Sequence, residues 1–489
     1  MRHLQILDDG LRERVLSEAF GLLEDPGVRF QGDEGLTLLA EAGARIERGR
    51  QVARIPEDLA RRALSTVPRE FVLGDADGAP CVRYGGDLVH FDPGSAAVRV
   101  LDSDTGEARQ ADSNDLVRLV KVADLLPEID AQSTALVCSD VPAAIADSYR
   151  LLLVLLHSRK PIVTGAFGLE GQRVMLEMLA IASGAGGRPP RAVFDVCPSP
   201  PLTWSLFATG SLIGLARAGV PAEMVSMPLA GATAPATLAG ALVQHAAECL
   251  SGITLHQLVR AGSPIVWGGA PAIFDMRHGT TPMGAMETAL LDAGYAEVGK
   301  SLGLPTHAYL GASDAKTIDA QAGMESGMTA LVGALAGINM ISGAGMLDFL
   351  ATQSVEKLVL DAEGIAMTRR LLTGISGREE TLATHLFAEL GHRGAFLELR
   401  HTRDWFRREQ HLPSPVIDRG SLRSWVEAGR PSVADRAHRR VEALLASWQP
   451  PEVDAGMERE LRCLAGSVAR AAGMAALPES ALGVARAGR

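Results

Sequence analysis

Short apolar runs, each followed by a longer Ala-rich or amphipathic stretch, recur from about residue 131 onward. The eight runs are AQSTALV, KPIVTGAF, RAVFDV, PAEMVSM, SPIVWGG, PTHAYLG, INMISG and EKLVL. Strands that alternate with helices build parallel sheets, and eight such units over roughly 230 residues favour a (β/α)8 TIM barrel over an open sheet. No G-x-G-x-x-G follows a predicted strand, so an open nucleotide-binding sheet is the weaker alternative.

The segments on either side of this repeat have other patterns. Three amphipathic patterns in residues 1–70 predict an N-terminal helical cap. Short β-like runs and then ADSNDLVRLVKVADLL predict a small β insert with a linking helix over residues 71–130. The predicted barrel takes residues 131–365, and the charged, helix-like residues 366–489 form a C-terminal helical extension.

One stretch has the length of a membrane span. From Gly327 to Leu347, GMTALVGALAGINMISGAGML has 21 residues without a charge, and about 20 apolar residues suffice to cross a bilayer. Its glycines from Gly333 to Gly345 divide it, however, into a buried helix that ends near Gly337 and a buried strand. We therefore predict a core segment and no contact with a membrane.

Composition excludes several classes of protein. A net charge of −11 argues against a nucleic-acid surface, which needs clustered Lys and Arg. The five cysteines form no C-x-x-C pair and the histidines no H-x-x-x-H or H-x-H, so no metal site is predicted. The N-terminus MRHLQILDDGLRERVL has no apolar h-region, which predicts a cytoplasmic location.

Candidate functional residues follow the predicted strands, because a barrel carries its active face at the carboxyl ends of its strands. Asp195 closes AVFD, Trp267 ends PIVW, and Tyr309 ends the sixth run. The same reasoning selects Asp275 and Arg277 in GGAPAIFDMRHG. Trp267 has the alternative of a core position, and Arg277 that of an ordinary ion pair with Asp275 or Glu287.

Charge gathers abruptly in LGASDAKTIDAQAG, after the sixth run. Asp314 could cap the next helix, Lys316 could be a solvated residue of its first turn, and Asp319 could answer the helix dipole. The alternative is a catalytic role at the active face. Spacing alone leaves both open and leaves the reaction open too.

Four segments carry a family resemblance. SDAKTIDAQAGMES, ALAGINMISGAGMLDF, SVEKLVLDAE and GGAPAIFDMRHG closely resemble the trimethylamine methyltransferase family, whose members transfer a methyl group to a corrinoid protein. LLEDPGVRFQGDEGLTLLAEAGARIE, LDSDTGEARQADSNDLVRLVKVADLL and DRGSLRSWVEAG extend the likeness over nearly the whole chain. The resemblance implies a (β/α)8 barrel and a corrinoid-dependent amine methyltransferase.

The resemblance also bears on the substrate. Founding members carry pyrrolysine in the stretch that corresponds to MESGMTALVGALAG, near Ala330, where this chain has ordinary residues. It therefore resembles the branch that demethylates quaternary amines such as glycine betaine. A quaternary ammonium releases a neutral tertiary amine, so no proton transfer is needed, whereas a tertiary amine must be activated.

The site implied by the resemblance joins a cation pocket to acidic residues. Aromatic faces suit a quaternary ammonium, and Arg or His can hold a substrate carboxylate. The expected catalytic residues are Asp314, Lys316 and Asp319, of which the two aspartates could supplement the cation field or hold the loop and Lys316 in place. The expected substrate-binding residues are Trp204, Trp267, Phe274, Arg277, His278, Tyr309, Gln321, Glu325 and Asn339.

No corrinoid-binding motif of the Asp-x-His-x-x-Gly kind occurs, so we expect no tightly bound cofactor. The corrinoid, as methyl acceptor, should arrive on a partner protein or as free cobalamin, and we expect a homo-oligomer. Three alternatives stay open at this point: a tertiary methylamine such as trimethylamine as substrate, a lyase with Lys316 as a Schiff-base lysine, and a barrel that binds betaines without turnover.

Overall fold

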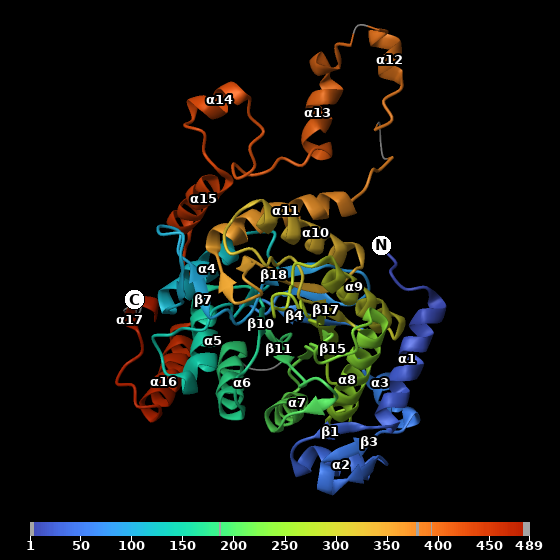
Figure 1. Cartoon of the computed structure of the whole chain (residues 1–489). Coiled ribbons are helices and arrows are strands. Elements are labelled where there is room, and N and C mark those ends of the chain that lie inside the picture. The colour runs from blue at the N-terminus through green and yellow to red at the C-terminus, as the bar shows by residue number, and fades with distance from the viewer. Residues whose placement is uncertain (1–3, 185–186, 378–380, 393, 483–489) are drawn as a thin grey trace.

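A parallel eight-stranded barrel lies at the centre of the computed structural model, which describes residues 4–184, 187–377, 381–392 and 394–482 (Figure 1). Neighbouring strands follow the order β6, β18, β17, β15, β13, β11, β10, β9. Their bounds are β6 (His90–Pro93), β9 (Gln132–Ser133), β10 (Ile162–Thr164), β11 (Ala192–Val196), β13 (Ala222–Met224), β15 (Ile265–Gly269), β17 (Thr306–Ala308) and β18 (Met340–Ala344). The backbone N–H of Asp130 donates to the Phe91 carbonyl at 2.8 Å, which brings the β9 edge against β6.

Each barrel strand is followed by a helix that packs outside the sheet (Figure 1). The helices are α4 (Ser113–Leu125), α5 (Ala146–His157), α6 (Leu169–Ser183), α7 (Leu206–Ala218), α8 (Leu238–Val259), α9 (Met286–Ser301), α10 (Ala320–Leu335) and α11 (Val355–Leu372). The (β/α)8 prediction is therefore confirmed. The barrel strands are nearly continuous apolar runs because both faces of a parallel sheet are covered.

One of the eight predicted strands is wrong. The run EKLVL at residues 356–360 lies inside α11, whose first turn is capped by Ser354. The missing strand is β6, which precedes all the others and lies in the segment 71–130 that the sequence assigned to the insert. Periodicity cannot separate a five-residue apolar run in a strand from one in a buried helix, and this explains the error.

A β-hairpin plugs the amino-terminal end of the barrel. β4 (Phe71–Gly74) pairs antiparallel with β5 (Pro80–Tyr84). Phe71, Leu73, Val82 and Tyr84 pack with the inward-facing residues Ala131, Val163, Val193, Val266 and Met340. These apolar side chains fill the lower half of the interior, so only its carboxyl half is left for polar chemistry.

The N-terminal segment contains the three predicted helices and a small sheet. α1 (Asp9–Glu24), α2 (Asp33–Glu41) and α3 (Glu57–Thr66) pack against α8. The sheet contains β12 (Thr203–Trp204), β1 (Val28–Phe30), β3 (Val52–Arg54) and β2 (Arg45–Glu47), in that order. The one-turn helix η1 (Arg48–Arg50) joins β2 to β3.

Smaller elements occupy loops around the barrel. A four-stranded sheet has the order β19 (Met346–Leu347), β20 (Thr352–Gln353), β7 (Arg99–Leu101), β8 (Ala108–Gln110). β14 (Leu229–Ala230) pairs with β16 (Ala272–Ile273), and η2 (Ala143–Ile145) precedes α5. The strands of the four-stranded sheet follow β6 and β18, and β14 and β16 follow β13 and β15. These strands therefore lie on the carboxyl side of the barrel.

The predicted C-terminal helices divide into two sets. α15 (Val433–Ser447) packs on α11 and α4, and α16 (Ala455–Ala471) packs on α5 and α6. α17 (Glu479–Leu482) lies against α4 and α5. α12 (His385–Leu390), η3 (Phe396–Glu398), α13 (Arg400–Glu409) and α14 (Leu422–Glu427) instead project from the body (Figure 1).

The uncharged stretch from Gly327 to Leu347 divides as predicted. α10 ends at Leu335, Gly337 adopts a φ of 70°, and β18 begins at Met340. Across the part of the chain that the structure describes, no helix is long and apolar enough to span a membrane.

Candidate active site

Six polar side chains from five barrel strands meet in the carboxyl half of the barrel interior. They are Asp92 on β6, Asp195 on β11, Glu223 on β13, His307 on β17, Tyr309 directly after β17, and Ser342 on β18. We call them the barrel cluster. All are buried except Asp195, which is partly exposed. Asp195 is therefore the residue of the cluster nearest to solvent, although its carboxyl oxygen Oδ1 is itself buried.

Hydrogen bonds order one side of the cluster. The Ser342 hydroxyl donates to Oδ2 of Asp92 at 2.8 Å, and His307 Nε2 lies 3.0 Å from the same hydroxyl oxygen. When the serine proton lies on Asp92, the histidine donates from Nε2. His307 Nδ1 then carries its lone pair toward Glu223, whose Oε1 is 3.2 Å away.

Tyr309 and Asp195 form the other side. The Tyr309 hydroxyl donates to Oδ2 of Asp195 at 2.9 Å, and the tyrosine ring meets the His307 ring edge to face at 5.0 Å. Among the described residues, Oδ1 of Asp195 has no hydrogen-bond partner. This oxygen is buried, the Glu223 carboxyl is near enough to act on the pKa of Asp195, and an aromatic face lies beside it.

Burial shifts the protonation of the cluster. Desolvation raises the pKa of Asp92 and of Glu223 well above the usual carboxyl range, and the nearby Asp195 charge raises that of Glu223 further. Desolvation raises the pKa of Asp195 to about 6 and lowers that of His307 to about 3. At neutral pH Asp195 is therefore mostly a carboxylate and His307 is neutral, and burial disfavours the charged forms of Asp92 and Glu223.

A buried arginine lies behind the mouth. Arg150 on α5 donates to the carbonyls of Thr134 at 2.6 Å and Gly165 at 3.3 Å, at the carboxyl ends of β9 and β10. Its guanidinium lies 4.5 Å from the Phe167 ring centroid, and burial lowers its pKa to about 10. Asp195 and Tyr309 are among the groups whose charge acts on it. The mouth thus combines a carboxylate, a guanidinium and the half-exposed ring of Phe167.

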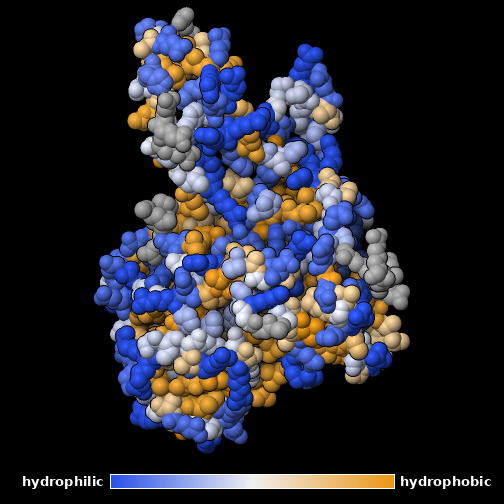
Figure 2. All heavy atoms as spheres, turned by 180° about the vertical axis from the view of Figure 1, so that it is seen from behind, coloured by the Kyte–Doolittle hydropathy of each residue, from blue (hydrophilic) through white to orange (hydrophobic). Residues whose placement is uncertain are grey.

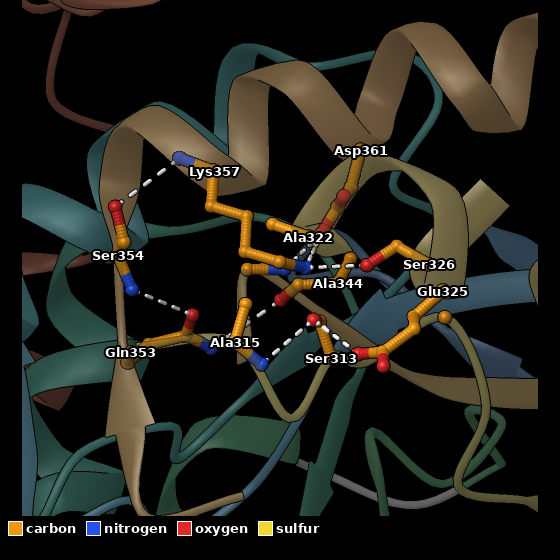
Figure 3. A network of polar contacts seen from close by, with 12 residues as sticks. Ser313, Ala315, Ala322, Glu325, Ser326, Ala344, Gln353, Ser354, Lys357 and Asp361 are labelled. Atoms are coloured by element: carbon orange, nitrogen blue, oxygen red, sulfur yellow. Dashed lines mark hydrogen bonds and ion pairs between the residues drawn. The ribbon is translucent and has the colours of Figure 1, made fainter. Parts of the chain in front are cut away.

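The charged stretch after β17 forms a separate network (Figure 3). The Asp314 carboxylate accepts from the N–H groups of Met283 (2.8 Å) and Gly284 (3.1 Å). Glu325 Oε2 accepts from Ser313 Oγ at 2.6 Å and from the Asp314 N–H at 2.8 Å. Desolvation raises the pKa of Asp314. Asp314 and Glu325 thus tie the loop after β17 to the loop before α9, which is a positioning role.

Lys316 and Asp319 have local partners. The Lys316 ammonium donates to the Asp314 carbonyl at 2.6 Å, lies 3.5 Å from the Asp348 carboxylate and sits over the Phe349 ring. Its side chain is 60% exposed, without the desolvation that activates Schiff-base lysines. Asp319 is the N-cap of α10 and accepts from the Ala322 N–H. The helix cap that the sequence offered to Asp314 is therefore formed by Asp319, while the Asp314 carboxylate binds the loop before α9.

Two tryptophans predicted for the cation pocket lie in the core. Trp204 stacks with Phe30 and donates from Nε1 to Ser251 on α8. Trp267 points out of β15 toward the helices and donates from Nε1 to the Tyr295 carbonyl at 3.0 Å. Both are fully buried outside the barrel interior, so neither ring is presented to a ligand.

The remaining predicted contacts are spread over the molecule. Arg277 and His278 are exposed and both pair with Asp275, and Phe274 is partly buried in the same loop. Gln321 is exposed and donates to Glu325. Asn339 precedes β18 at the amino-terminal end, where its side chain donates to three carbonyls of residues 85–88. Of the expected catalytic and substrate-binding residues, the structure brings only Tyr309 into the barrel cluster, where it meets Asp195, a candidate selected from its place at the end of AVFD.

Sequence reasoning missed most of the cluster. Glu223, His307 and Ser342 are single polar residues inside the runs PAEMVSM, PTHAYLG and INMISG. Such a residue cannot face the apolar layer between sheet and helices without a penalty, so it must face the barrel interior. This signal was present. Asp92 was hidden because β6 was assigned to the insert, and Arg150 because it lies on a helix.

Ala330, the position discussed for pyrrolysine, lies on α10 outside the barrel cluster. It is buried and lines a cavity of about 120 Å³ between α10 and α11, together with Gly311, Asp361 and Ile365. The nearby Lys357 ammonium donates to Ser326 and to Asp361 (Figure 3). Over the described ranges, no three His, Cys, Asp or Glu side chains are arranged to hold a metal ion.

Comparisons with known proteins agree over nearly the whole chain. A family model described as trimethylamine methyltransferase (MTTB) matches residues 1–471. The trimethylamine methyltransferase MttB of Desulfitobacterium hafniense is 30% identical, covering 91% of this chain and 90% of that protein. The MttB of Methanosarcina barkeri is 33% identical, covering 91% of both. The glycine betaine methyltransferase of D. hafniense is 29% identical, covering 94% of this chain and 95% of that protein.

A solved structure has the same fold. The hydroxylamine MtmB complex aligns with a TM-score of 0.50 at 15% identity, over 89% of this chain and 94% of that chain. At this identity the likeness concerns the fold alone.

Proposed function

The chain belongs to the trimethylamine methyltransferase family, and we propose that it moves a methyl group from a quaternary amine of the glycine betaine kind to the Co(I) of a corrinoid. The corrinoid is a second substrate, brought by a partner protein or supplied as cobalamin. It provides the nucleophile: cobalt forms a bond to the methyl carbon, the carbon–nitrogen bond breaks, and its electron pair stays on the amine.

The observation that carries the proposal is a buried carboxyl oxygen of Asp195 that has no hydrogen bond among the described residues, near the carboxyl end of the barrel. Asp195 is held by the Tyr309 hydroxyl, and Oδ1 has no partner among the described residues. A permanent cation cannot lose its charge, so a fixed carboxylate and aromatic faces are the groups that bind it. Tyr309 and Phe167 supply such faces, and Arg150 supplies a positive charge for a substrate carboxylate.

The role of the remaining residues is to orient the groups that bind the substrate and to keep water away from it. Asp92, Ser342, His307 and Glu223 form a buried polar floor that holds the Tyr309 ring in place. Asp314 and Glu325 hold the loop above it. No residue has to supply a proton, because the leaving tertiary amine is neutral. Founding members of the family carry pyrrolysine near the position of Ala330. Because this chain has an ordinary residue there, the resemblance supports a quaternary substrate.

A second candidate substrate is a tertiary methylamine such as trimethylamine. Burial raises the pKa of Glu223 and favours its neutral form, and a neutral acid beneath the mouth could protonate an amine. The relatives named trimethylamine methyltransferase support the same reading. A Schiff-base lyase has less support, because Lys316 is exposed and outside the barrel cluster.

A substrate screen separates these functions. The purified chain is mixed with Co(I) cobalamin and glycine betaine, carnitine, proline betaine or trimethylamine, and the visible spectrum is followed. We expect methylcobalamin to form with at least one betaine and not with trimethylamine. Methylation by trimethylamine alone would establish the second candidate, and calorimetric binding of a betaine without any methylation would show a barrel without turnover.

The pKa of Asp195 predicts the pH dependence. Because burial raises this pKa to about 6, the carboxylate is charged above this pH and neutral below it. The attraction for a permanent cation is therefore present at high pH and lost as pH falls. We expect kcat/KM for the active betaine to fall about tenfold per pH unit below pH 6. A profile that is flat between about pH 5 and pH 8 would remove Asp195 from the proposal.

A further inference from the structure

An apolar layer lies at the carboxyl end of the barrel interior, beside the barrel cluster. Its members form one buried cluster: Val225, Ala270, Ala272, Met283 and Tyr309. Three of them come two positions after residues that face the interior, which are Glu223, Gly268 and His307. Because side chains alternate along a strand, these three face the interior as well, one layer nearer the mouth. We call the cluster the rim layer.

Leu350 packs against the rim layer from a different loop. Its side chain is partly buried and belongs to the loop between β18 and α11, whereas the residues of the rim layer follow β13, β15 and β17. Figure 2 shows hydrophobic spheres on the lobe that carries α12 and α13 as well, but no described residue of that lobe belongs to the rim layer. Leu350 therefore differs from other apolar surface residues by its place at the mouth.

The backbone that places Leu350 is left-handed over three consecutive residues. Asp348, Phe349 and Leu350 have φ angles of 50°, 56° and 68°. A residue other than glycine is strained in this region, and a bulky one more so, because its Cβ meets the neighbouring carbonyl. Such strain persists only where the surrounding structure holds it, and it is concentrated at active sites and ligand clamps. We call residues 348–350 the left-handed turn.

Contacts with two neighbouring loops hold the left-handed turn. The Asp348 N–H donates to the Ala315 carbonyl at 3.0 Å. The Asp348 carboxylate lies 3.5 Å from the Lys316 ammonium and 3.5 Å from the Arg99 guanidinium. The same ammonium lies 3.8 Å from the centroid of the Phe349 ring. Lys316, which the sequence singled out for catalysis, is therefore a positioning residue of the left-handed turn.

We propose that Leu350 is a specificity-determining residue, which limits the size of the fourth substituent on a quaternary amine substrate. This inference rests on the proposed function, because it concerns the same site. The methyl groups of a trimethylammonium head are apolar, so the rim layer can cover them without the loss of a hydrogen bond. Leu350 then narrows the space that remains for the fourth substituent.

The left-handed turn makes this limit a fixed one. Because Lys316 and Arg99 hold the turn, the leucine cannot move aside without breaking these contacts. A betaine with a short substituent, such as glycine betaine, should therefore bind more tightly than one with a longer, branched substituent, such as carnitine.

The test is calorimetric binding of glycine betaine and carnitine to the full chain and to a Leu350→Ala variant. Alanine shortens the side chain at the mouth, so the longer substituent gains more than the shorter one. We expect the ratio of the Kd for carnitine to the Kd for glycine betaine to fall at least about tenfold. The control, Leu88→Ala, changes a leucine 48% exposed just before β6, at the amino-terminal end of the barrel. It should keep this ratio within about twofold of the wild type.

Leu350→Gly separates the backbone from the side chain. Glycine adopts a positive φ without strain, so we expect this variant to unfold at a higher temperature than Leu350→Ala. Its Kd ratio should fall as far as that of Leu350→Ala, because both variants lack the leucine side chain.

Lys316 variants test what holds the turn. Lys316→Gln removes the charge that faces Asp348 and Phe349, so the ratio should fall by about threefold. Lys316→Arg keeps a cation that pairs with a carboxylate and stacks on a ring, and it should keep the wild-type ratio. An unchanged ratio in Lys316→Gln would remove the positioning role of this lysine.

Either of two results would overturn the proposal. One is a Kd ratio in Leu350→Ala and Leu350→Gly that stays within about twofold of the wild type. The other is a wild-type chain that does not bind glycine betaine more tightly than carnitine. Methyl transfer to Co(I) cobalamin, measured on the same samples, tests the proposed function separately. If the ratio falls and no sample methylates cobalamin, the proposed function is wrong and the role of Leu350 in binding stands. Methylation with an unchanged ratio contradicts only the role of Leu350.

Discussion

We expect the Asp195→Asn variant to show a kcat/KM for the active betaine about 100-fold below that of the wild-type chain. The change removes a carboxylate whose pKa of about 6 leaves it charged at neutral pH, on the one residue of the barrel cluster that is partly exposed. Two unit charges about 5 Å apart attract by roughly 3 kcal/mol at an effective dielectric of 20, and 1.4 kcal/mol is a factor of ten. The asparagine keeps the shape and can still accept from the Tyr309 hydroxyl.

The loss of kcat/KM in Asp195→Asn can be measured from initial rates of methylcobalamin formation between about pH 7.5 and pH 8. Asp319→Asn is the matched control, because it also removes a carboxylate from the active side but keeps an N-cap for α10. We expect that variant to stay within about twofold of the wild type. Equal losses in both variants would show that the barrel responds to net charge and that Asp195 has no direct contact with the substrate.

The Trp267→Ala variant should lose about 3–5 kcal/mol of unfolding free energy. Trp267 is fully buried, its indole packs against Gly299 of α9, and its N–H donates to the Tyr295 carbonyl. Alanine leaves a cavity between β15 and the helices and an unpaired carbonyl. Urea unfolding followed by circular dichroism measures the loss. Trp267→Phe keeps most of the ring and should lose less than half as much.

The alternative for Trp267 is the cation pocket that the sequence suggested. A variant that keeps its unfolding free energy but has a KM for betaine raised by tenfold or more would support that pocket. It would also require the ring to turn into the barrel interior, where Gly268 and not Trp267 faces His307.

Local patterns predicted most of the elements. Seven of the strands and the helices between them follow from short apolar runs that end in glycine, proline or polar residues, because each element buries its own face. The division of the uncharged stretch 327–347 came from its glycines. Local patterns could not show where the strand–helix repeat begins, because EKLVL and the β6 run HFDP are both short. Only closure of the barrel decides which of the two is a strand.

The sequence by itself therefore determined a (β/α)8 barrel and, through resemblance, its family. Only the tertiary structure decided which charges meet. Asp314, Lys316 and Asp319 are close together in the chain but have separate surroundings. Asp314 binds the loop before α9, Lys316 lies on the solvated surface, and Asp319 caps α10. Asp92, Glu223 and Ser342 are far apart in sequence and share one interior. Hydrophobic periodicity reports how each segment faces the core, whereas a site depends on the strands that closure sets side by side.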